Sequence, residues 1–128
     1  LHFHSINTET FSLDLVHLKT SELAKAKLAL KQNAITPKIN DKNYVVIEKG
    51  RHPLLDAKTV VPISLELGKS FKTLVVTGPN TGGKTVSIKT IGLMCLMAMC
   101  GLMIPCSEDS EVSIFTNILY TNIIKKSI

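Results

Sequence analysis

The sequence predicts an α/β fold in which a helical segment precedes a domain of alternating strands and helices. Three observations predict it. Apolar residues recur at helical spacing before Pro37, and after Pro37 they alternate at the spacing of strands. Further along, a glycine-rich loop separates a β-branched stretch from a long stretch free of proline. We therefore expect residues 1–36 to form a helical segment and residues 37–128 to belong to one mixed domain.

The first element is expected to be a helix from about Asn7 to Asn33. Asn7 and Thr8 have side chains that cap helix starts, and Glu9 follows in the first turn. Apolar residues then recur on one face at Phe11, Leu15, Leu18, Leu23, Ala26 and Leu30. Pro37 disfavours helical geometry at Thr36, so the helix should end before it.

Three strands are expected next. Residues 44–48 are rich in β-branched and aromatic side chains, and residues 60–67 alternate apolar with polar positions. Residues 50–53, Gly-Arg-His-Pro, form the turn between them. Residues 71–77 are apolar and β-branched, as a buried strand leading into a loop would be.

The glycine-rich loop is the most specific motif in the chain. Its sequence fits G-x-x-x-x-G-K-[ST], the loop that wraps the phosphates of a nucleoside triphosphate: Gly78, Pro79, Asn80, Thr81, Gly82, Gly83, Lys84 and Thr85. The glycines let backbone N–H groups approach phosphate oxygens, and Lys84 can reach the β- and γ-phosphates. The Thr85 hydroxyl is a candidate ligand of the accompanying Mg²⁺. The motif therefore predicts ATP and Mg²⁺ as cofactors and the N-terminal half of a P-loop NTPase.

After the loop we expect a helix from about Gly83 to Cys100. Gly101 stands where a left-handed cap belongs, and Pro105 follows it. Residues 112–119 are expected to be the last strand. The acidic run at residues 107–111 follows a proline-containing stretch that does not suggest a buried strand, so we interpret it as a solvated loop. No catalytic residue is therefore assigned within this chain.

Composition narrows the remaining classes. The net charge is +5, from 15 basic and 10 acidic residues, and several lysines lie between Lys19 and Arg51. They suit either a nucleic-acid surface or a solvated face, and their scattered spacing favours the second. Residues 91–104 are strongly apolar but too short for a membrane span. Three cysteines without C-x-x-C spacing indicate buried thiols in a reducing cytoplasm, and the N-terminus does not resemble a signal peptide.

The chain resembles the ATPase region of MutS-type DNA repair proteins, most closely the bacterial MutS-II branch. The stretches that carry the likeness are residues 50–55, Val60-Val61-Pro62, residues 77–86 and residues 104–112. The resemblance implies an ATPase that dimerises around its nucleotide and couples ATP turnover to DNA binding. In this branch the activity serves recombination suppression or ribosome rescue, and full-length members carry a nuclease domain. It also implies that Val60 and Val61 pack on the adenine, although an ordinary strand start explains these two residues equally well.

Several motifs of the family are missing from this sequence. The family's Mg²⁺-holding Asp, its adjacent Glu, the signature segment and the nuclease domain have no counterpart here, and the likeness ends near Ile118. We therefore expect a truncated ATPase domain, from a fragment or an interrupted gene, that is not competent for hydrolysis by itself. Three alternatives remain open: a nucleotide-binding or structural remnant without turnover, a MutS mismatch-recognition ATPase, and another P-loop family. Residues 50–53, at their distance before the loop, argue against the last.

Overall fold

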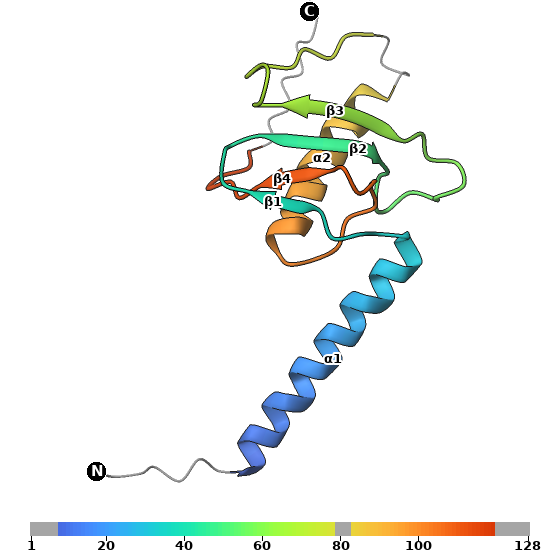
Figure 1. The fold of residues 1–128 in the computed structure, drawn as a ribbon. Coiled ribbons are helices and arrows are strands. Elements are labelled where there is room, and N and C mark those ends of the chain that lie inside the picture. Colours follow the sequence, from blue (N-terminus) through green and yellow to red (C-terminus); the bar gives the residue numbers. More distant parts are fainter. Residues whose placement is uncertain (1–7, 79–82, 120–128) are drawn as a thin grey trace, which may run out of the picture.

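The structure is a computed structural model that describes residues 8–78 and 83–119, with side chains from residue 19 onward. In these ranges the chain is mixed α/β, as the sequence predicted, with a small sheet and two helices (Figure 1). The elements in chain order are α1 (Thr8–Gln32), β1 (Lys38–Asn40), β2 (Val45–Gly50), β3 (Ile63–Leu67), α2 (Lys84–Met99) and β4 (Glu111–Ser113). The predicted bounds of α1, β2 and α2 agree with these to within three residues.

The four strands form one sheet in the order β1-β4-β2-β3. β1 and β4 run parallel, whereas β2 is antiparallel to both of its neighbours. α2 packs on one face of this sheet, while α1 projects away from it (Figure 1). The core lies between α2 and the sheet and consists of aliphatic and sulfur-containing side chains: Val45, Ile47, Met94, Cys95, Met97, Ile104, Cys106 and Val112.

β4 is much shorter than the predicted strand over residues 112–119. Its neighbour β1 ends at Asn40, and Ile114 makes the last bond of the ladder by donating its N–H to the Asn40 carbonyl at 3.2 Å. Beyond that point β1 turns away, so residues 114–119 have no strand beside them and remain irregular. The prediction of a long final strand was wrong because strand length depends on the partner.

Two buried serines fasten β4 to the rest of the sheet. The Ser110 hydroxyl accepts the Glu48 N–H at 3.0 Å, and the Ser113 hydroxyl accepts the Asn43 N–H at 3.1 Å. Both side chains are almost completely inaccessible to solvent. The interpretation of residues 107–111 as a solvated loop therefore holds for Glu108 and Asp109, which are exposed, but not for Ser110, nor for Glu111, which begins β4. Buried hydroxyls with partners of this kind stabilise, because an unpaired one would be costly.

The predicted buried strand at residues 71–77 is absent. This stretch has no strand geometry, and its apolar side chains are exposed, with Val75 at 76%. Among the described residues, its backbone makes one bond to a neighbour, in which the Gly68 N–H donates to the Phe71 carbonyl at 2.7 Å. β-branched residues favour a strand only where another strand supplies the ladder, and none of β1 to β4 lies along this stretch.

α2 ends as predicted, with Gly101 in the left-handed region at φ 72°. Only a residue without Cβ adopts this conformation readily, which explains the glycine at this position. Past Ile91, α2 is apolar on all sides, although some of its apolar side chains there remain exposed. Across residues 8–78 and 83–119, no helix combines the length and the hydropathy that crossing a bilayer requires.

The three cysteines differ in burial. Cys95 and Cys106 are buried, but Cys100 is exposed, so the prediction of three buried thiols was wrong for Cys100. It caps the C-terminal end of α2. Burial raises the pKa of Cys95 to about 11 and also raises the pKa of Cys106. The two buried thiols are therefore held in their neutral form.

We expect a thiol reagent at pH 8 to modify Cys100 well before Cys95. The reactive species is the thiolate. Because the pKa of Cys95 is raised to about 11, its thiolate fraction is about a hundredfold below that of an ordinary thiol. Because Cys95 is buried as the neutral thiol, its contribution to folding stability is complete below the ordinary thiol pKa. That contribution is lost as pH rises through about 11. Mass spectrometry after timed labelling checks the order. Equal rates at Cys95 and Cys100 in the folded chain would contradict this description of the core.

Candidate functional site

The two ends of the predicted phosphate loop face each other in the structure. Gly78 precedes the loop with φ 137°, and Gly83 closes it with φ 76°. Pro79, Asn80, Thr81 and Gly82 lie outside the described residues, so their part in the site stays a prediction. A Cβ at Gly78 or Gly83 would meet nothing within 4 Å, which means that backbone conformation rather than space calls for glycine at both positions.

The start of α2 has the properties of an anion-binding helix end. Gly83 is its N-cap and supplies no side-chain cap, and no acidic residue occupies the first turn. Ser87 makes the first helical bond, donating its N–H to the Gly83 carbonyl at 2.9 Å, so the preceding N–H groups are not used by the helix. The positive end of a 16-residue helix therefore faces the loop, with the Thr85 side chain exposed beside it.

Lys84 bridges the two ends of the loop. Its ammonium donates a hydrogen bond to the Gly78 carbonyl, and its side chain is only partly exposed. The predicted phosphate-binding cation therefore lies against Gly78, the first residue of the predicted loop. An anion placed there meets the ammonium and the N–H groups of the helix start together.

A hollow of about 470 Å³ adjoins the loop, and we call it the α2 hollow. One side is formed by residues 50–63, including Val60 and Val61, and the other by Gly83 and the first two turns of α2. The two valines that the sequence proposed as nucleotide contacts thus line the same hollow as the end of the phosphate loop. Val61 is 79% exposed, which is more than an ordinary core strand start allows.

A β-bulge lies at the end of β2, where the chain enters the wall of the α2 hollow at Gly50. The register of β2 against β3 shifts between Ile47 and Gly50, and Lys49 adopts φ 50°. The Lys49 N–H donates to the Ser64 hydroxyl at 2.9 Å and so fixes the bulge. Sequence reasoning took residues 50–53 for a simple turn. A glycine ending a strand is the one signal that could have revealed the bulge.

The polar groups of the α2 hollow are already oriented. The hydroxyls of Ser87 and Thr90 donate to helix carbonyls at 3.0 and 2.7 Å, which leaves their lone pairs for other partners. The His52 Nδ1 accepts the Leu54 N–H at 3.2 Å, so the neutral ring carries its proton on Nε2. Among the described residues, none that line this hollow carries a carboxylate.

Comparison with known proteins gives two findings. The family model described as MutS domain V matches residues 74–126, which include the predicted phosphate loop and α2. Proteins with the name Endonuclease MutS2 are similar over 95 residues, which is 74% of this chain: the identity is 57% for those of Ruminiclostridium cellulolyticum and Brevibacillus brevis. It is 58% for that of Finegoldia magna. The matched residues span 12% of the length of each relative. On these two findings the chain is a segment of MutS-II type, as its motifs predicted.

Proposed function

We propose that this chain binds a nucleoside triphosphate, ATP by resemblance, with its phosphates in the loop from Gly78 to Thr85. The observation that carries the proposal is the coincidence of three features at one place. An uncapped helix start, the Lys84 ammonium and two positive-φ glycines surround the same loop. Each favours an anion, and together they form a site for a polyphosphate.

The remaining parts of the nucleotide are assigned by their distance from the phosphates. The base lies along the α2 hollow, against half-buried Val60 and exposed Val61, whose apolar surfaces suit a flat ring. The Thr85 hydroxyl, exposed in the first turn of α2, would help to hold the Mg²⁺ that accompanies the phosphates. When bound, the metal neutralises phosphate charge. Among the described residues, no three acidic, histidine or cysteine side chains are grouped to hold a metal by themselves.

In a longer protein of this type, we propose that the site serves an ATPase coupled to DNA binding. The similarity to Endonuclease MutS2 proteins supports this, and a homodimer, DNA as partner and a cytoplasmic location follow from the same resemblance. Domain boundaries near residue 36 belong to this proposal as well, with residues 37–128 as the first part of the ATPase domain.

The Lys84→Ala variant tests the phosphate site. We expect its affinity for mant-ATP to fall about 10- to 100-fold, because a charge-assisted hydrogen bond contributes roughly 1.5–3 kcal/mol and 1.4 kcal/mol is tenfold in affinity. Fluorescence titration with Mg²⁺ present measures it. Lys38→Ala removes the same charge from β1, at the opposite edge of the sheet from β3, and should bind like the wild type. Equal affinities of the Lys84→Ala and wild-type chains would refute the assignment.

A second candidate function is nucleotide binding without turnover. The observation that favours it is that none of the described residues lining the α2 hollow carries a carboxylate, the group that the family resemblance expects to activate water. We expect the wild-type chain to release phosphate from ATP no faster than Lys84→Ala does, in a coupled phosphate assay. Release by the wild type that Lys84→Ala abolishes would show that the chain itself supplies a catalytic group.

A further inference from the structure

The last turn of α1 joins the helix to the rest of the described structure. Of its described side chains, from residue 19 onward, only Ala29 is buried. Directly after the helix, Asn33 takes φ 48°, and Ile35 exchanges two backbone bonds of 2.9 Å with Ile104. The helix then projects from this anchor without another element beside it (Figure 1). Its direction is therefore set by whatever holds its C-terminal end.

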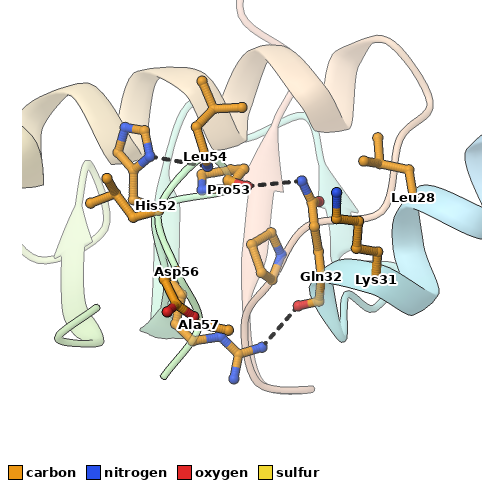
Figure 2. Close-up of a pocket in the computed structure, with 11 residues that line it drawn as sticks. Leu28, Lys31, Gln32, His52, Pro53, Leu54, Asp56 and Ala57 are labelled. Carbon is orange, nitrogen blue, oxygen red and sulfur yellow. Dashed lines mark hydrogen bonds between the residues drawn. The ribbon is translucent and has the colours of Figure 1, made fainter. Parts of the chain in front are cut away.

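Arg51 holds that end. Its Nη2 donates to the carbonyls of Gln32 and Asn33 at 3.2 and 3.1 Å, and its backbone N–H donates to the Pro105 carbonyl at 2.9 Å. Carbonyls at a helix end have no helical partner, and a positive charge beside them is favourable. Gln32 adds a second tie by donating from Nε2 to the Pro53 carbonyl at 3.1 Å (Figure 2). Each of the two segments thus donates a side-chain hydrogen bond to the other: Arg51 donates to the end of α1, and Gln32 of α1 donates to Pro53.

The segment that holds α1 also forms one side of the α2 hollow. A second hollow of about 470 Å³ lies between the last turn of α1 and residues 51–57, and we call it the α1 hollow (Figure 2). His52 and Leu55 line both hollows. The segment is also internally bonded, since His52 Nδ1 accepts the Leu54 N–H and the Asp56 carbonyl accepts the Val60 N–H at 2.9 Å. A shift of residues 51–57 against α1 must therefore alter the wall of the α2 hollow, and a shift at the α2 hollow must alter the contacts with α1.

We infer that Arg51 is a positioning residue that couples occupancy of the α2 hollow to the direction of α1. The inference rests on the proposed nucleotide site. A nucleotide that contacts Val60 and Val61 would hold residues 52–61 in one position. Arg51, which precedes these residues, would then hold the carbonyl end of α1 in one position as well. The coupling is reciprocal, because whatever favours one position of α1 must change nucleotide affinity by the same factor.

The test combines nucleotide affinity with the position of α1 in the full chain. Spin labels on Cys100, the exposed native thiol, and on a Lys19→Cys variant report the distance between α2's end and α1 by pulsed electron resonance. We expect ATP and Mg²⁺ to shift or narrow this distance distribution. In the Arg51→Ala variant the distribution should stay broad with or without ATP, and mant-ATP affinity should fall about fivefold or more, the lower end of typical couplings.

Three further variants make the outcome decisive. Lys58→Ala removes a cation from the same segment without touching α1 and should leave both measurements unchanged. Gln32→Leu breaks only the tie to Pro53, so it should act in the same direction as Arg51→Ala but more weakly, and it serves if Arg51→Ala does not fold. If wild-type binding depends on Lys84 but neither Arg51→Ala nor Gln32→Leu alters affinity or distance, the coupling is overturned and the proposed function stands. If the wild type does not bind mant-ATP, or Lys84→Ala binds equally well, the proposed function and the coupling fail together.

Discussion

Replacing Gly68 with alanine is expected to destabilise the fold by about 3 kcal/mol or more, a large part of the stability of a small domain. Gly68 lies just after β3 with φ 95°, and an added Cβ would come within 2.4 Å of the Asn43 carbonyl oxygen and 2.9 Å of the Tyr44 Cα. Both atoms belong to the backbone that leads into β2. Relief therefore requires that backbone to move, and this displaces the pairing of Val45 with Leu67.

Two other glycines provide matched controls for the same added methyl group. At Gly50 the new Cβ would meet Ile47 Cγ2 at 2.4 Å and Met94 Cε at 3.1 Å, and because these are side-chain atoms the cost should be about 1–3 kcal/mol. At Gly92, within α2, nothing lies within 4 Å, so alanine should stabilise by about 0.5–1 kcal/mol. Urea denaturation measures all three. If Gly68→Ala unfolds no more easily than Gly50→Ala, the close approach of the two backbones does not hold in solution.

Local patterns predicted the elements whose cause is local. α1 and α2 follow from helical spacing and from end signals such as Gly101, and β2 follows from its β-branched residues. Residues 71–77 and 114–119 carry strand-forming residues too, but they have no strand beside them in the described structure. Strand propensity shows only that a segment can adopt an extended backbone. A neighbouring strand decides whether a ladder of hydrogen bonds forms. β1 was missed for the converse reason, because three residues with no clear pattern become a strand beside β4.

The candidate site likewise has one part that the local sequence predicts and another part that depends on the fold. The loop motif alone located the helix start and Lys84, because the spacing of its residues reflects one local geometry. No local pattern indicated that the guanidinium of Arg51 would reach carbonyls 18 and 19 residues earlier in the chain. Nor did any predict that His52 would line two hollows, since that depends on how α1 and α2 pack around one segment. Contacts distant in sequence need the fold before they can be named.

The second large effect is expected at the apolar surface formed by α2 and residues 71–77. Both segments carry exposed apolar side chains: Phe71, Leu74, Val75, Val76, Val86, Ile88, Leu96 and Met99. A mostly apolar hollow of about 590 Å³ lies alongside α2, with Leu67, Ile91 and Phe115 in its wall. Large apolar side chains exposed in this number favour association. The backbone of residues 72–77, which pairs with no strand of the described sheet, adds strand-forming groups to these side chains.

We therefore expect the 128-residue chain to self-associate and the double variant Val75→Lys with Leu96→Lys to be monomeric. Val75 and Leu96 are 76% and 46% exposed, so the lysines need not disturb the core, while two like charges oppose burial of the surface. Sedimentation velocity at increasing protein concentration measures the change. Leu30→Lys with Leu54→Lys adds the same charge at leucines that are 82% and 80% exposed on α1 and the segment 51–57, and it should associate like the wild type. If this control also becomes monomeric, net charge rather than the α2 surface governs association, and if the wild type is monomeric at every concentration, the surface is not adhesive at all.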